Sequence, residues 1–94
     1  MQVSDLPEGI RQSKYLSPEV LNKIAGCGEF PKEKDLFQMR PVPAVQYILD
    51  NFAHDFAAFE REMHLLAAQE TEQNNEWYAF KLLMIVEYSR ESLV

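Results

Sequence analysis

All three glycines and all five prolines of this 94-residue chain lie before residue 44. These two residue types interrupt helices more strongly than any others, and neither occurs in the second half of the chain. A segment of this length without them permits long, uninterrupted helices. The distribution therefore predicts an all-α fold.

The first long helix is predicted over residues 43–69, with Pro43 in its first turn. Its apolar residues recur alternately four and three positions apart, the spacing of a knobs-into-holes seam. Apolar residues of the following helix continue this helix-packing seam. Its members are Val45, Leu49, Phe52, Phe56, Phe59, Met63, Leu66, Trp77, Phe80 and Met84.

A second helix is predicted over about residues 75–92. Residues 77–88 are apolar on nearly all sides, which is typical of a helix enclosed by others. The run 82–86 also fits a strand by its period alone, but its leucines and Met84 favour a helix.

Eight polar residues, 69–76, separate the two helices. As a loop, this octet folds the helices into a long hairpin, and as a helix it joins them into one continuous rod. We expect the hairpin, because apolar faces must find cover within a domain. A rod paired in a dimer is the alternative.

A short helix is predicted over residues 17–25, packed across the hairpin. Ser17 is a suitable N-cap, Pro18 suits the first helical position, and Gly26 suits a left-handed stop. These signals surround an apolar face and define a complete small helix.

The remaining segments show weaker patterns. Residues 1–16 have no periodicity, so we expect a flexible arm. Residues 26–42 are a proline-rich connector, with a helical turn around residues 32–38. The whole of 1–94 is thus expected to be a single small helical domain.

The chain has 15 acidic and 9 basic residues, a net charge of −6 with both histidines neutral. This charge disfavours direct binding to nucleic acid and favours a basic partner. One cysteine, Cys27, excludes an intramolecular disulfide and fits a reducing compartment. With no secretory signal pattern and no apolar run of bilayer length, we expect a cytoplasmic protein without membrane contact.

No residue pattern indicates catalysis, a metal site or a cofactor, so we predict none of these. His54 and His64 lie on the predicted helix 43–69 in directions roughly 80° apart, so one helix cannot bring both to one ion. Both are expected to be solvated. Cys27 follows a helix C-terminus, whose negative end disfavours a thiolate, and is expected to be a small apolar loop residue.

Acidic residues concentrate in residues 43–72, where six acids and one base, Arg61, give −5 of the net charge of −6. On the side of this helix that faces away from the seam lies a mixed aromatic and charged strip. Tyrosine and arginine are enriched in protein contact sites, so this strip is the predicted interaction surface. It consists of Tyr47, Asp50, His54, Arg61 and Leu65.

We therefore predict a small non-enzymatic protein–protein interaction module, such as an adaptor, assembly chaperone or regulatory subunit, that acts through its helix faces. The alternative is an acidic inhibitor that occupies a basic, nucleic-acid-binding groove of a target protein. A homodimer is also expected, because a hairpin and one short helix have little interior in which to enclose the last helix.

Overall fold

The structure is a computed structural model that describes residues 1–39 and 42–92. Within these residues every regular element is a helix and no strand occurs, which confirms the all-α prediction. The elements are a short 3₁₀ helix η1 (Val3–Asp5) and the helices α1 (Glu8–Arg11), α2 (Pro18–Ala25), α3 (Glu33–Phe37), α4 (Pro43–Phe52), α5 (Phe56–Glu72) and α6 (Glu76–Ser92).

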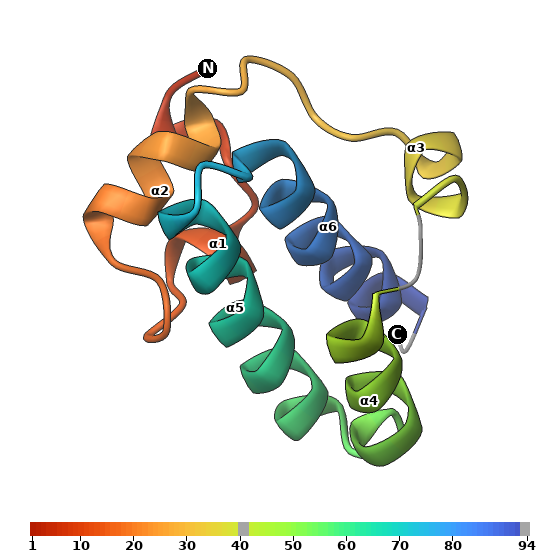
Figure 1. The fold of residues 1–94 in the computed structure, drawn as a ribbon. Helices are drawn as coiled ribbons and strands as arrows, with labels where there is room; N and C mark the ends of the chain where they lie inside the picture. Colours follow the sequence, from red (N-terminus) through yellow and green to blue (C-terminus); the bar gives the residue numbers. More distant parts are fainter. Residues whose placement is uncertain (40–41, 93–94) are drawn as a thin grey trace.

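Helices α5 and α6 form a hairpin and share the most extensive contact in the fold (Figure 1). This confirms the hairpin and excludes the continuous rod. The turn takes up only residues 73–75, because α5 continues to Glu72 through half of the polar octet and α6 begins at Glu76. Asn74 has a φ of +65°, a left-handed conformation that asparagine tolerates better than most residues. The Asn75 N–H then donates to the Glu70 carbonyl at 2.9 Å.

The first arm of the hairpin begins at Phe56 and not near residue 43. Asp55 has extended backbone, and the Ala58 N–H donates to its carboxylate at 3.3 Å, so Asp55 is the N-cap of α5. The predicted helix 43–69 is therefore two helices, with α4 packed against α5. The seam residues Phe52 and Phe56, on either side of the break, keep the regular spacing of four positions, so the apolar pattern does not reveal the break.

The break also divides the predicted seam. In α5 and α6 its members are buried (Phe59, Met63, Phe80 and Met84) or half-buried (Phe56, Leu66 and Trp77). In α4, Phe52 is half-buried and the buried face is Val45 with Ile48. Leu49 is 41% exposed, so its placement in a buried seam is wrong. The non-helical residues 53–55 reset the helical phase, and α4 consequently turns a different face inward.

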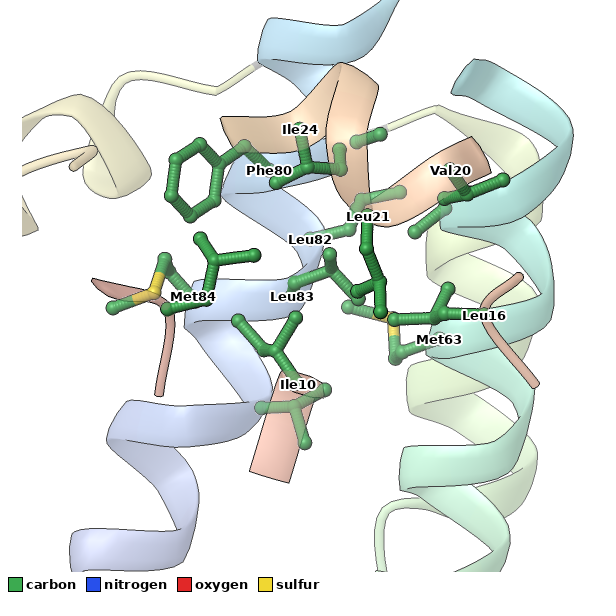
Figure 2. Close-up of a cluster of buried hydrophobic side chains, with 14 of the residues drawn as sticks. Ile10, Leu16, Val20, Leu21, Ile24, Met63, Phe80, Leu82, Leu83 and Met84 are labelled. Atoms are coloured by element: carbon green, nitrogen blue, oxygen red, sulfur yellow. The ribbon is translucent and has the colours of Figure 1, made fainter. Parts of the chain in front are cut away.

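The N-terminal segment packs into the core, in contrast to the flexible arm predicted for residues 1–16. Leu6, Ile10 and Leu16 are buried, and η1 packs against α2. Figure 2 shows Ile10 and Leu16 between α5 and α6, close to Met63 and Leu83. Their spacing of four and six residues matches no regular period, so a pattern search does not detect them.

Helix α2 confirms the helix predicted over 17–25 and crosses the ends of α5 and α6 (Figure 1). The Val20 N–H donates to Ser17 Oγ at 3.2 Å, and Pro18 occupies the first turn. Gly26 keeps a right-handed φ of −62°, so the left-handed stop predicted there is wrong. The left-handed residue is Gly28, with a φ of +84°.

Helix α6 is enclosed on most sides, as its apolar composition predicted. Its buried residues are Ala79, Phe80, Leu82, Leu83, Met84, Val86 and Glu87. The cover comes from α5, α2 and the N-terminal segment, with α3 at one side. Helix α3 corresponds to the helical turn predicted around residues 32–38. None of the described helices combines the length and apolar character needed to cross a bilayer.

Substitution of Asn74 tests the hairpin turn. Asn74→Gly should leave the free energy of unfolding unchanged or slightly raised, because glycine adopts positive φ without strain. Asn74→Val should lower it by about 1–2 kcal/mol, since a β-branched residue resists the left-handed conformation. Urea denaturation followed by circular dichroism measures both. Gln73→Val, at a negative φ of −92°, is the control and should have a smaller effect than Asn74→Val.

Candidate functional site

Two regions of the structure are candidates for a functional site. The first, here called the polar cluster, lies where the N-terminal segment meets α5 and α6 and consists of Ser13, Glu60, His64, Glu87 and Arg90. The second is an apolar hollow at the junction of α4, α5 and α6.

His64 is 1% exposed, so the prediction of a solvated side chain is wrong. Its Nδ1 lies 2.7 Å from Ser13 Oγ, and the Tyr15 N–H donates to the same oxygen at 3.2 Å. A hydroxyl that already accepts one hydrogen bond is best satisfied by donating its own proton to Nδ1, which places the imidazole proton on Nε2. Among the described residues, Nε2 has no hydrogen-bond partner.

Burial lowers the pKa of His64 to about 4, although the charge of Glu60 acts in the opposite direction. The imidazole is therefore neutral near pH 7. A group with so low a pKa is a weak general base, and Glu60, the carboxylate whose charge acts on the ring, pairs with Arg90 and not with the imidazole. The Ser13–His64 pair thus fastens the N-terminal segment to α5 and lacks the geometry of a catalytic relay.

Arg90 on α6 holds the charged half of the polar cluster together. Its Nε donates to Glu87 at 3.0 Å, its Nη2 pairs with Glu60 of α5, and the guanidinium lies 5.1 Å from the centre of the Phe56 ring. Burial lowers the pKa of Arg90, but the hydrogen bonds to Glu60 and Glu87 outweigh this effect and raise the pKa above its ordinary value. The network links the two arms of the hairpin.

Gly9 of α1 packs directly on this network. A Cβ atom at Gly9 would overlap Glu87 Oε1 and lie 2.8 Å from Arg90 Nη2. The overlapping atoms are the ends of the Glu87 and Arg90 side chains, so one or both must move to admit a methyl group. Glycine is therefore the residue that allows α1 to approach α6 so closely.

The described residues offer little for metal or thiol chemistry. Among them, no group of three or more His, Cys, Asp or Glu side chains is placed to hold a metal ion. Cys27 is half-buried, and both burial and the nearby Glu76 raise the pKa of its thiol, which disfavours the reactive thiolate.

The apolar hollow has a volume of about 280 Å³ and lies where the α4–α5 turn meets α6. We call it the Leu49 hollow; its lining residues are Leu49, Ala53, His54, Phe56, Phe59 and Ser89. A second hollow of about 300 Å³ lies toward α3 and is called the Leu36 hollow; it is lined by Glu33, Leu36, Ile85, Tyr88 and Ser89. Ser89 belongs to both, so the two hollows are neighbours on α6.

The five residues of the predicted contact strip are all exposed. The break at residues 53–55 distributes them over α4, the turn and α5, so they do not form one strip along a single helix. They are Tyr47 and Asp50 on α4, His54 in the turn, and Arg61 and Leu65 on α5. Of these, His54 lines the Leu49 hollow.

Comparison with known proteins gives no further guide to the site. No protein-family model, no curated protein and no solved structure matches this chain.

The buried neutral His64 predicts a pH-dependent stability. The unfolded chain takes up a proton at this histidine near its ordinary pKa of 6.5, whereas the folded protein does so only near 4. The unfolded state thus binds more protons between these values, and the free energy of unfolding should fall by about 2 kcal/mol from about pH 7 to about pH 5. Urea denaturation at several pH values measures this slope.

Two glutamine variants separate His64 from the other titrating groups. His64→Gln should flatten the slope between about pH 7 and about pH 5, because no group at this position then gains a proton on unfolding. His54→Gln, at an exposed position, should retain it. Identical slopes in the two variants would exclude His64 as the source.

Gly9→Ala tests the close contact between α1 and the ion network. The added methyl group must displace the ends of the Glu87 and Arg90 side chains, and the better helix propensity of alanine offsets part of this cost, so we expect a loss of stability of about 1 kcal/mol by chemical denaturation. Gly28→Ala is a poor control because its φ is positive, whereas Ser4→Ala at an exposed N-terminal position should have little effect. A Gly9→Ala variant as stable as the parent would contradict the contact.

Proposed function

We propose that this protein is a small non-enzymatic interaction module that binds another protein through the Leu49 hollow. The observation that supports this most directly is the position of Leu49, which is 41% exposed beside an apolar hollow also lined by Phe56 and Phe59. Exposed apolar surface next to a hollow, in a protein whose core is otherwise enclosed, is typical of a contact site.

The size of the hollow supports a protein partner. Sites for small molecules enclose about 300–1,000 Å³ and bury most of the ligand. The Leu49 hollow, at about 280 Å³, lies at the lower end of this range and is open to solvent at Leu49. It suits the side chain of a partner, since interface hot spots commonly consist of one large side chain in a desolvated pocket.

Charge supports a basic partner over a second copy of the chain. Residues 43–72 hold six acids and one base, a sum of −5, and they include α4 and α5, which line the hollow together with Ser89 of α6. A symmetric dimer through this face would bring two such segments together, and their like charges repel. In addition, the N-terminal segment covers α6, which removes the main reason for expecting a homodimer.

Two exposed leucines provide a matched test. Leu49 and Leu65 are 41% and 42% exposed, but only Leu49 lines the hollow. We expect affinity capture from the native host to lose its partner with Leu49→Lys and to keep it with Leu65→Lys. Truncation or charging of a central anchor commonly costs at least about 2 kcal/mol, or about 30-fold in affinity. Circular dichroism checks that both variants fold.

The other outcomes also discriminate. If Leu49→Lys captures the same proteins as the parent, the hollow is not the contact site. Loss of capture with Leu65→Lys alone would place the contact at the exposed residues Arg61 and Leu65 of α5. The alternative function, an acidic inhibitor of a nucleic-acid-binding groove, predicts capture that weakens steeply with salt and depends little on Leu49.

A further inference from the structure

We infer that the partner contributes a basic amphipathic helix, which crosses α6 at Ser89 and places one apolar side chain in the Leu49 hollow and another in the Leu36 hollow. This inference rests on the proposed function and names the partner of the same site. It follows from the arrangement of the two hollows, the face of α6 between them and the distribution of charge.

The exposed face of α6 forms the floor of this site. Ile85, Tyr88 and Ser89 are each half-buried and occupy positions i, i+3 and i+4, so they share one helix face. Leu36 of α3 stands on one side of this face and Leu49 of α4 on the other, because each lines a hollow that includes Ser89. Ser89 is small, so a partner backbone can approach closely where the two hollows meet.

A helix suits this arrangement better than a strand. Within residues 1–39 and 42–92 there is no β-sheet, and an added strand would find no sheet edge with which to pair. Helix-in-groove recognition needs only hollows for side chains that project from one face of the bound helix. Two neighbouring apolar hollows meet that requirement.

The charges around the hollows predict how the helix is oriented. Near the Leu49 hollow, Asp50 and Asp55 are exposed and adjoin lining residues in the chain, whereas Arg90, whose guanidinium lies 5.1 Å from the centre of the Phe56 ring, is paired with Glu60 and Glu87. Near the Leu36 hollow, Glu33 lies between Lys32 and Lys34, which offset its charge. The basic residues of the partner should therefore cluster around the anchor that enters the Leu49 hollow.

Three synthetic peptides of equal length test this inference on the full chain. One has leucines on one helical face and lysines on the other, the second has glutamates in place of the lysines, and the third is a scrambled leucine–lysine sequence without an apolar face. NMR titration of the ¹⁵N-labelled protein should show shifts at Leu49, Ala53, Ile85 and Ser89 with the first peptide. The protein should bind the leucine–lysine peptide at least about 10-fold more tightly than it binds the glutamate peptide or the scrambled peptide.

Variants of the protein locate the binding site. Ser89→Trp, which blocks the junction of the hollows, should weaken the leucine–lysine peptide by at least about 10-fold, and Leu49→Lys should do the same. Leu65→Lys, at equal exposure but outside the hollows, should bind as the parent does. The NMR spectrum of each free variant shows whether it keeps the fold, and Leu49→Lys carries the test if Ser89→Trp does not.

Several results would overturn the inference. Equal binding of the three peptides, or shifts confined to residues outside the two hollows, would exclude a basic amphipathic helix. Shifts at Leu49 and Ser89 that depend on protein concentration alone, with a dimer mass in sedimentation, would place a second copy in the hollows. If no peptide binds but capture from the host still depends on Leu49, the helix is wrong and the proposed function stands.

Discussion

The arrangement of this protein depends on the need to cover α6, which is apolar on nearly every face. In so short a chain no single element can enclose such a helix, so several share the task. Helix α5 covers one side in the hairpin, α2 crosses the end, and Ile10 and Leu16 of the N-terminal segment fill a further gap between α5 and α6 (Figure 2). The face formed by Ile85, Tyr88 and Ser89 is left half-buried, and the two hollows lie there.

The polar cluster is a consequence of how the N-terminal segment is held. This segment has only short helices, and polar contacts add to the burial of Leu6, Ile10 and Leu16 in holding it in place. Ser13 bonds the buried His64, and Gly9 lies against the Arg90 network of α5 and α6. Such buried polar groups contribute little net stability when satisfied, but removal of one partner leaves an uncompensated buried group. They therefore select one docked position of the segment.

The Leu49 hollow forms because the chain breaks its helix between α4 and α5. If residues 43–69 formed one helix, Leu49 would lie in line with Phe59 and Met63 against α6. Asp55 starts a new helix, α5, so α4 and α5 do not share one helical phase. Helix α4 therefore buries Val45 and Ile48 in place of Leu49. An apolar residue that continues a packing pattern in the sequence thus becomes part of an open hollow. The acidic residues of the same segment give that hollow its preference for a basic partner.

The sequence by itself determined the all-α class, the helix α2 and the enclosed nature of α6. These features depend on local properties: the lack of glycine and proline after residue 43, the cap at Ser17 and the apolar composition of residues 77–88. Only the tertiary structure decided that residues 1–16 pack into the core, that His64 is buried and that Leu49 is exposed. His64 meets a partner 51 positions away, at Ser13, and the exposure of Leu49 depends on how α4 packs against α5. The spacing of residues along the chain reflects local helix geometry, so it does not indicate which distant segments come into contact.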